Sequence, residues 1–328
     1  MVVDTEVPRR RRVGGGALSA LIVLLTVCFL LAAGLRLLGI DGTRYMIAAT
    51  ALTPYTTAVG VLLGCLALLV RRWAAGTVVL LVAVVLVAAV APRVFPDSRP
   101  NGVGVEVRVM SVNMLFGQAD AVDIVAAVRD NQIDVLSLQE LTPEAVVDLD
   151  RAGIGTLLPH RVFQAEPGAR GSGIASRYPL TGRALTPPGT MREPGALVDL
   201  PGKQDIEVIA VHTMPPVVTA GPEAWQRELA GLPNRDINGP PRVLAGDFNA
   251  TLDHVGLRRL LSNGYVDAAD EVGAGLEPTW PAGKFWPPPV TIDHVLVDNR
   301  CPVDTYGVLS IAGTDHRAVV TKFVVPAL

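Results

Sequence analysis

Acidic, amide and imidazole side chains recur at the ends of short apolar runs in the C-terminal two-thirds of this chain. They are Asn113, Glu140, His212, Asp247, Asn249, Asp293, Asp315 and His316. Carboxylate oxygens are the ligands that a hard divalent ion such as Mg²⁺ prefers. Hydrolysis of a phosphate ester needs neutralised phosphoryl oxygens, a positioned water and a stabilised leaving oxygen. These residue types therefore indicate a metal-dependent phosphate-ester site, if the fold brings them together.

The spacing of two pairs adds detail to this interpretation. Asp247 and Asn249 are two positions apart, so on an extended segment they point the same way and could face one phosphate. Asp293 and His316 could form a carboxylate–imidazole pair, which fixes the tautomer of the ring and favours its charged form. Glu140 ends an apolar run and is the first choice for a metal ligand.

Each of these residues also has a structural explanation when taken alone. Asn113 could cap a turn, and Asp247 with Asn249 could form an Asx turn. Glu140 could be the acid at the start of a helix. His212 alone would be explained as a partly buried, hydrogen-bonded ring. Because the residues occur together and in order, we favour the catalytic interpretation.

The elements that must position these residues alternate between β and α patterns. Val105, Val107 and Val109 alternate with polar residues, as in a half-buried strand. Further strands are expected in 133–138, 173–176, 206–211, 243–245, 295–297 and 318–325. Helices are expected in 121–130, from Pro143, in 222–232 and in 254–261. Interleaved strands and helices predict an α/β domain with helices layered on sheets.

The front of the chain predicts a membrane anchor of three helices. The apolar runs Gly16–Ile40, Met46–Val70 and Trp73–Ala91 each approach the ~20 residues that cross a bilayer. They lack the polar stripe of a soluble helix, which argues against a buried hairpin. Two further runs follow the first, which argues against a cleaved signal peptide. Arg36 is expected to reach the lipid headgroups, and Pro54 to be tolerated inside the second span.

Basic residues predict the orientation of this anchor. Four arginines, 9–12, precede the first run, and Arg71-Arg72 separates the second from the third. The positive-inside rule places both groups in the cytoplasm. Three crossings then leave everything after about Pro92 outside, so we expect a multi-pass protein of the cytoplasmic (plasma) membrane with an extracytoplasmic domain.

The expected organisation is therefore a basic tail (1–15), three transmembrane helices (16–92), a Pro- and Gly-rich linker (93–104) and a catalytic domain (105–328). From Asp97 onward the chain holds 19 of its 28 basic and 28 of its 31 acidic residues, a net charge of −9. That charge argues against tight, non-specific polyanion binding. It allows a phosphate substrate, because a bound cation supplies positive charge locally. The three cysteines form no zinc-binding pattern.

Seven short motifs resemble those of the endonuclease/exonuclease/phosphatase superfamily, which includes deoxyribonucleases, sphingomyelinases and inositol polyphosphate 5-phosphatases. They are Ser111-Val112-Asn113, Leu138-Gln139-Glu140, 171–177 (GSGIASR), Val211-His212-Thr213, Gly246-Asp247-Phe248-Asn249, Ile292-Asp293-His294 and Thr314-Asp315-His316. The resemblance covers about 105–325. Thr314 stands where many members have Ser, and Arg317-Ala318 follows the last motif where many members have a Pro within two residues. The resemblance implies a two-sheet β-sandwich flanked by helices, a four-layer α/β fold.

The resemblance also implies a role for each site residue. Glu140 would bind Mg²⁺ (or Mn²⁺), helped by Asn113, with Asp315 as a second metal ligand. The catalytic group would comprise His212, Asp247, Asn249, Asp293 and His316. Within it, Asp247 would orient or deprotonate the attacking water and Asn249 would hold the phosphate. His316 would contact a phosphoryl oxygen with Asp293 as its partner, and His212 would contact the phosphate or the leaving group. His294 would be structural.

The predicted function is thus a membrane-anchored, Mg²⁺-dependent phosphoesterase, with diester hydrolysis favoured over monoester hydrolysis. The substrate classes left open are nucleic acid, phospholipid headgroups and small phosphate esters. No protein partner is predicted. Trp280 and Trp286 lie in a Pro-rich segment and either line the substrate mouth or pack beneath that loop. The alternative from another class is a non-catalytic phosphate-ligand binding module that retains the fold.

Overall fold

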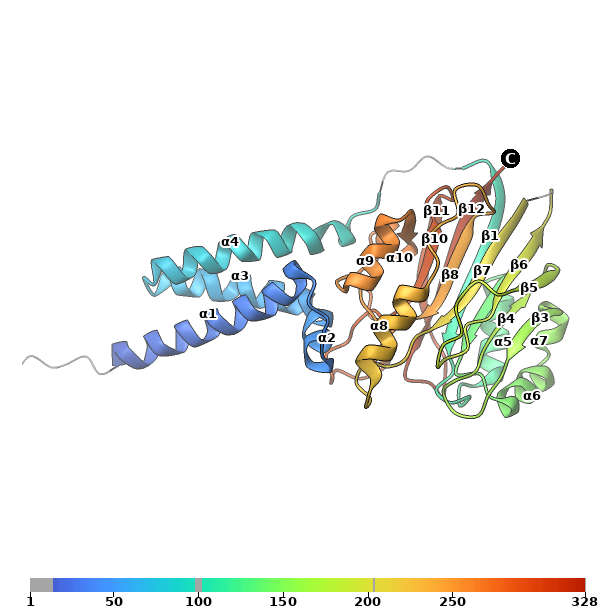
Figure 1. Ribbon diagram of the computed structural model, residues 1–328, viewed down its shortest axis with the longest axis horizontal. Coiled ribbons are helices and arrows are strands. Elements are labelled where there is room, and N and C mark those ends of the chain that lie inside the picture. Colours follow the sequence, from blue (N-terminus) through green and yellow to red (C-terminus); the bar gives the residue numbers. More distant parts are fainter. Residues whose placement is uncertain (1–13, 98–101, 203, 328) are drawn as a thin grey trace, which may run out of the picture.

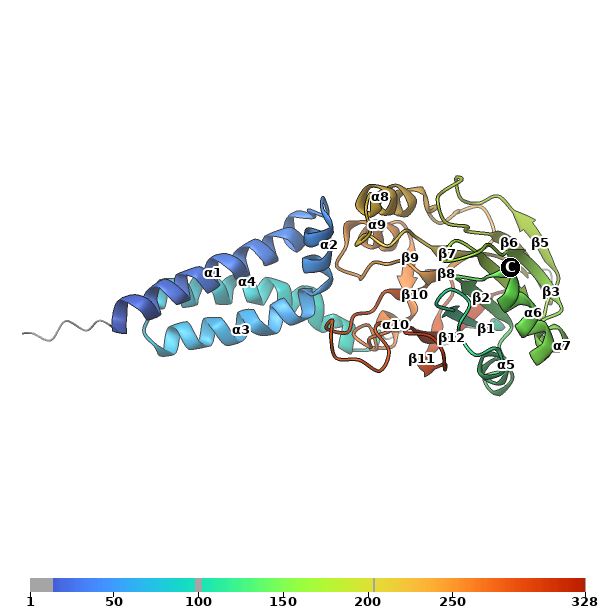
Figure 2. The same cartoon turned by 90° about the horizontal axis from the view of Figure 1, so that it is seen from below.

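The computed structural model describes residues 14–97, 102–202 and 204–327. It has two parts, an N-terminal helical bundle and a larger α/β domain (Figures 1 and 2). The bundle extends from one side of the domain, and α2 lies across the junction between the two parts.

The bundle contains α1 (Gly14–Leu38), α2 (Arg44–Ala51), α3 (Thr53–Leu69) and α4 (Trp73–Val90), followed by the short 3₁₀ helix η1 (Ala91–Val94). Glycines let the long helices approach closely. A Cβ on Gly60 would lie 2.3 Å from the Phe29 ring, and one on Gly64 would lie 2.6 Å from Leu80. Small residues serve the same purpose where membrane helices pack.

Two single helices, rather than three, are long and apolar enough to cross a membrane within the described residues. They are Gly16–Leu38 and Trp73–Val94. The predicted second span, 46–70, is wrong as one straight helix, because it divides into α2 and α3, which meet at 68°. Pro54 lies in the first turn of α3. Proline lacks the N–H that a continuing helix needs, so it favours a new start at this point. Only the bent pair taken together could make a third span.

The α/β domain is built from two six-stranded mixed sheets. The first has the order β11-β12-β1-β2-β4-β3. Its strands are β1 (Gly104–Asn113), β2 (Val135–Gln139), β3 (His160–Gln164), β4 (Ser172–Ser176), β11 (Val303–Ser310) and β12 (Arg317–Pro326). The second has the order β5-β6-β7-β8-β10-β9. Its strands are β5 (Leu180–Arg183), β6 (Gly195–Leu200), β7 (Gln204–His212), β8 (Arg242–Asp247), β9 (Tyr265–Asp267) and β10 (Asp293–Asp298).

Helices cover the outer face of each sheet. The domain helices are α5 (Ala121–Asp130), α6 (Pro143–Ala152), α7 (Ile154–Leu157), α8 (Gly221–Gly231), α9 (Val255–Ser262) and α10 (Ala268–Glu271). Val107 and Val109 of β1 are buried between the sheets, whereas Met110 and Val112 are buried with α5 and α6. Trp225 of α8 packs against the other sheet. The predicted two-sheet sandwich flanked by helices is confirmed.

Strand register brings the polar strand ends together. Parallel β1 and β2 place Asn113 beside Gln139, and parallel β7 and β8 place His212 beside Asp247. Antiparallel β10 begins with Asp293 opposite Asp247. Gly246 permits the close approach of β7 and β8, since a Cβ there would lie 1.8 Å from the Val211 carbonyl oxygen. One end of both sheets is therefore lined with acids, amides and imidazoles.

Candidate active site

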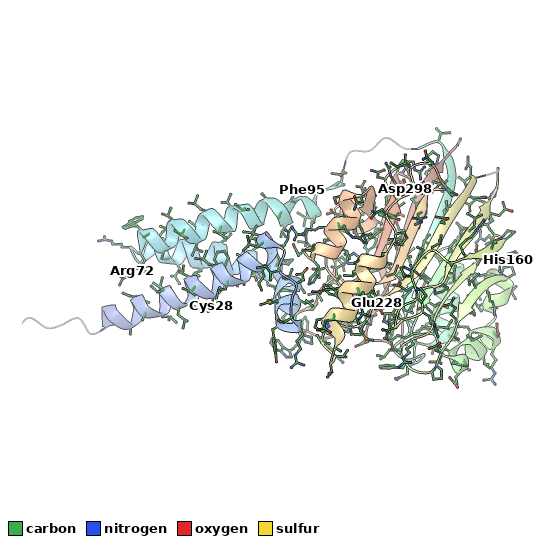
Figure 3. All side chains as sticks on the ribbon, viewed as in Figure 1. Cys28, Arg72, Phe95, His160, Glu228 and Asp298 are labelled. Atoms are coloured by element: carbon green, nitrogen blue, oxygen red, sulfur yellow. The ribbon has the colours of Figure 1, made fainter. Side chains whose placement is uncertain are left out.

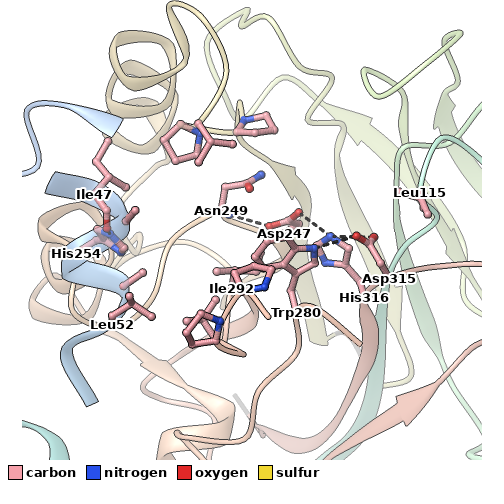
Figure 4. A pocket seen from close by; sticks show the side chains of 18 of the residues that line it. Ile47, Leu52, Leu115, Asp247, Asn249, His254, Trp280, Ile292, Asp315 and His316 are labelled. Carbon is pink, nitrogen blue, oxygen red and sulfur yellow. Dashed lines mark hydrogen bonds and ion pairs between the residues drawn. The ribbon is translucent and has the colours of Figure 1, made fainter. Parts of the chain in front are cut away.

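A pocket of about 410 Å³ lies at this end of the sheets. Its polar lining comes from Glu140, Asp247, Asn249, Asp315 and His316. Figure 4 shows the last four converging on one region, with the side chains of α2 across the pocket from them. The polar side chains Glu140 and His316, 176 positions apart in the sequence, thus share a single cavity.

Asn113 connects the carboxylates of the two sheets. Its Nδ2 donates to Glu140 Oε1 at 3.3 Å and to Asp247 Oδ2 at 3.0 Å. Its Oδ1 accepts the backbone N–H of Leu115 at 3.0 Å. Asn113 therefore presents its amide nitrogen, a donor, to the two acids. Asn113 could bind a cation through Oδ1 only after its side-chain amide had flipped by about 180°.

Glu140 is buried at the point where the chain leaves β2. Its φ of 56° is unusual for a residue with a Cβ, which indicates that its surroundings hold it in place. The Phe116 backbone N–H donates to Oε2 at 2.6 Å. Burial raises the pKa of Glu140, with help from the nearby Asp315 charge, against the hydrogen bonds from Phe116 and Asn113 and the charge of His316. A bound cation would lower the pKa of Glu140 again, because it favours the charged carboxylate.

His316, Asp293 and Asp247 form a buried chain of charges. His316 Nδ1 lies 3.0 Å from Asp293 Oδ2, and Nε2 lies 3.8 Å from Asp247 Oδ2. Ligand atoms of these three residues lie within 4.8 Å of one another, close enough to share one metal ion.

The pKa values of this chain follow from its geometry. Burial lowers the pKa of His316, but Asp293, Asp247 and Asp315 outweigh burial and raise it to about 10. His316 is therefore an imidazolium at neutral pH. Burial and repulsion from Asp293 raise the pKa of Asp247 to about 7, against His316 and the donors Asn249 and Asn113.

Asp315 carries a carboxylate oxygen, Oδ1, that receives no hydrogen bond and has only the distant His316 Nε2, at 3.9 Å, as a charged neighbour. Trp280 Nε1 donates to its Oδ2 at 3.1 Å, so Trp280 supports the site directly. Its Oδ1 is buried without a hydrogen-bond partner. A buried, unpaired carboxylate oxygen is costly, and a cation would remove that cost. With Glu140 and Asp247 close by, the donor set is rich in oxygen and fits Mg²⁺ or Mn²⁺.

Asn249 belongs to the turn that follows β8. Its backbone N–H donates to Asp247 Oδ1 at 2.8 Å, and its Nδ2 donates to Thr213 O at 2.9 Å. The Asx turn considered above is therefore present, and it holds both side chains at the pocket surface.

His212 and His294 lie outside the pocket lining. His212 is buried behind Glu140, with Nε2 3.9 Å from Glu140 Oε1 and Nδ1 without a partner. Burial and repulsion from His316 lower its pKa to about 3, so the ring is neutral. In this structure it touches Glu140 instead of the open pocket. His294, expected to be structural, faces Asp267 at 2.8 Å and the Ala250 carbonyl at 2.9 Å.

His254 and the α2 residues are pocket residues that the sequence motifs did not indicate. His254 Nδ1 accepts the Thr251 backbone N–H at 2.9 Å. Its Nε2 therefore carries the proton and donates to the Ile47 carbonyl at 2.9 Å. Neither residue follows a motif, and the contact spans 207 positions, so no local signal could have revealed it.

Comparison with known proteins decides the family. A model described as the Endonuclease/Exonuclease/phosphatase family matches residues 110–316. This chain belongs to that family. The matched region holds all eight residues of the predicted site. Members of the family are typically metal-dependent phosphoester hydrolases. Comparison with curated proteins gave no match.

Solved structures of family members share the fold. An endonuclease/exonuclease/phosphatase from Beutenbergia cavernae is 22% identical, with a TM-score of 0.52, and the match covers 67% of this chain and 72% of that one. A humanised D. rerio TDP2 is 15% identical, with a TM-score of 0.52, covering 67% of this chain and 99% of that one. D. rerio TDP2 in complex with a single-stranded DNA product is 15% identical, with a TM-score of 0.51 and the same coverage. The matches place the family fold on two-thirds of the chain.

Proposed function

We propose that this family member is a membrane-anchored, Mg²⁺-dependent phosphodiesterase. The observation that carries the proposal is the bridge by Asn113 between Glu140 and Asp247, beside the His316–Asp293 pair. The carboxylates of Glu140 and Asp247 and the charged imidazole of His316 thus lie together at the pocket. A binding module would not require an acid and a base positioned so closely.

Glu140 and Asp315 would hold the metal, with Asn113 assisting if its amide turned over. The group Asp247, Asp293 and His316 could hold an ion only if His316 were neutral, so with a charged His316 these three residues would serve proton transfer instead. When bound, Mg²⁺ would neutralise charge on the phosphoryl oxygens. Mn²⁺ would serve as an alternative because it accepts similar oxygen ligands.

The other catalytic roles would fall to individual side chains of the site. Asp247, with a pKa of about 7, is suited to orient a water and take its proton. His316, held charged by Asp293, can donate from Nε2 to a phosphoryl oxygen. Asn249, which lines the pocket with Asp247, would hold the phosphate through the Nδ2 hydrogen that it does not donate to Thr213. His212 would support Glu140 from behind.

The charges of the pocket favour a diester. None of the residues that line it is Lys or Arg, and His316 is the charged base among them. A phosphate diester carries one negative charge, whereas a monoester carries up to two near neutral pH. The pocket is better matched to the singly charged group.

The anchor sets the proposed location. Gly16–Leu38 and Trp73–Val94 would cross the cytoplasmic membrane, and α3 would enter it from α2. Arg72 lies at the end of the bundle remote from the domain (Figure 3). With Arg71 and Arg72 in the cytoplasm, the domain faces outward. A C-terminal reporter active only outside the cytoplasm tests this, and activity confined to a cytoplasmic reporter would overturn it.

The activity test uses the full chain in detergent with bis(p-nitrophenyl) phosphate. We expect hydrolysis with Mg²⁺ that EDTA abolishes. Glu140→Gln should lower kcat by about 100-fold or more. Glu144→Gln, the same change at an exposed position four residues later, should match wild type. Inactivity of wild type across Mg²⁺, Mn²⁺ and Ca²⁺ would favour the binding module.

A further inference from the structure

We infer that the substrate is a membrane lipid phosphodiester, whose hydrocarbon chain lies along α2 while its phosphate meets His316 and Asp247. This inference rests on the proposed function and names the substrate class of the same site. It starts from the two chemically different walls of the pocket. One wall is the polar group described above, and the facing wall is apolar.

The apolar wall belongs to the anchor. Ile47, Ala48, Ala51 and Leu52 line the pocket. The first three lie on one face of α2, and Leu52 follows directly as its C-cap. Ala48 is exposed in the pocket, and Ala51 and Leu52 are half-buried. A soluble phosphoesterase has no need of a wall supplied by the segment between two membrane-type helices. A substrate that itself sits in the membrane would meet that wall as it enters.

Contacts with the catalytic domain fix α2 in place. Ile47 is buried in one apolar cluster with Trp225 and Leu229 of α8. The Ile47 carbonyl accepts the hydrogen bond from His254. The apolar wall formed by α2 is therefore held firmly against the α/β domain.

The rim of the pocket carries exposed apolar side chains. Val217, which lines the pocket with Pro215 and Pro216, is 62% exposed. Phe285 and Trp286, just before Pro287 and Pro288 in the lining, are 94% and 81% exposed.

This rim lies near the membrane helices. Tyr55, in the first turns of α3, donates to the Pro289 carbonyl at 2.8 Å, which ties the rim to the point where α3 leaves the domain. Exposed aromatic side chains at such a position are typical of a membrane–water interface.

The same pocket is poorly suited to a nucleic acid. Nucleic-acid binding depends on Lys and Arg neutralising several phosphates. Among the described residues, none of those that line this pocket is Lys or Arg. In the reaction, the oxygen of water would bond to phosphorus as the P–O bond to one alcohol breaks. Asp247 would take the water's proton and later release it to solvent, and the departing alkoxide would take a proton from solvent.

The test uses a homologous series of alkyl p-nitrophenyl phosphates, from ethyl to dodecyl, with the full chain in lipid nanodiscs and Mg²⁺. All members release the same p-nitrophenol, so only the hydrocarbon chain differs. Each buried methylene is worth about fourfold in binding. We therefore expect kcat/KM to rise by at least about tenfold from ethyl to dodecyl.

Variants separate binding along α2 from simple partition into the disc. Ala48→Glu places a charge on the apolar wall and should sharply lower the dodecyl-to-ethyl ratio of kcat/KM. Ala184→Glu makes the same change at an exposed position after β5 and should keep the wild-type ratio. Trp286→Ala provides a second test at the rim and should lower the ratio as well.

The outcomes are distinct. A flat dependence on chain length, or an unchanged ratio in both Ala48→Glu and Trp286→Ala, overturns the lipid inference and leaves the phosphodiesterase proposal standing. Faster cleavage of a single-stranded oligonucleotide than of the dodecyl ester also overturns it. Inactivity toward every ester in the series contradicts the proposed function itself.

Discussion

Arg93 and Asp253 form a bidentate ion pair across the junction between the helical bundle and the α/β domain. Arg93 Nη1 and Nη2 donate to the two carboxylate oxygens at 2.9 and 2.7 Å. Arg36 adds a third hydrogen bond at 2.7 Å, instead of reaching lipid headgroups as its position in the sequence suggested. Asp253 is completely buried. Burial raises its pKa, but the hydrogen bonds and charges of Arg93 and Arg36 outweigh burial and lower it.

This pair should be essential for joining the two parts. Asp253→Asn leaves two arginines without their shared charge, and removing one partner of a buried pair costs about 3 kcal/mol or more. We expect a lower unfolding midpoint for the full chain in detergent, together with faster proteolysis near residue 97. Asp148→Asn breaks an exposed pair with Arg151 and should cost less than about 1 kcal/mol. Equal midpoints for the two variants would show that the junction does not depend on Asp253.

Glu193 should make stability depend on pH. Burial and repulsion from Glu228 raise its pKa to about 8, and its Oε1 has no hydrogen-bond partner. Between about pH 5 and pH 8 the folded state keeps a proton that the unfolded state has lost, so the free energy of unfolding falls as pH rises. Glu193→Gln should remove this part of the pH dependence. The unfolding midpoint of each protein at pH 5.5 and pH 8.5 measures it, and identical slopes would contradict the assignment.

Asp293 should act through His316. Asp293→Asn keeps a hydrogen-bond acceptor for His316 Nδ1 but removes the charge that favours the imidazolium. We expect kcat for bis(p-nitrophenyl) phosphate to fall by about 100-fold. Asp199→Asn, an exposed change on β6, should leave kcat unchanged. Wild-type kcat in Asp293→Asn would remove the pair from the mechanism.

Much of the fold followed from local pattern. The helices at 121–130 and 254–261, and the strands around 206–211 and 243–245, have clear periodicity and lie close to α5, α9, β7 and β8. Strands β3, β5, β6, β9 and β11 were not predicted. β3, β5 and β11 are half-buried or exposed, so they lack a continuous apolar run. β6 and β9 are mostly buried but only six and three residues long. Their pairing with distant strands creates them, and a local pattern does not contain that information.

The helical bundle shows a second limit of prediction from the sequence. Thr53-Pro54 marks the start of α3, a signal that was present in the sequence but was interpreted as tolerated within one long span. The packing of α2 against α8 and His254 depends on contacts across about 200 positions. The motif residues could be predicted to converge, because strand ends in such sandwiches share an edge. The apolar wall opposite them could not.

Binding of Mn²⁺ to the full chain, followed by electron paramagnetic resonance, decides whether Glu140 holds a metal ion. We predict that Glu140→Gln weakens Mn²⁺ binding by at least about tenfold, while Glu144→Gln binds as tightly as wild type. Equal Mn²⁺ affinity in wild type, Glu140→Gln and Glu144→Gln would contradict a metal site at Glu140, and with it the proposed hydrolase.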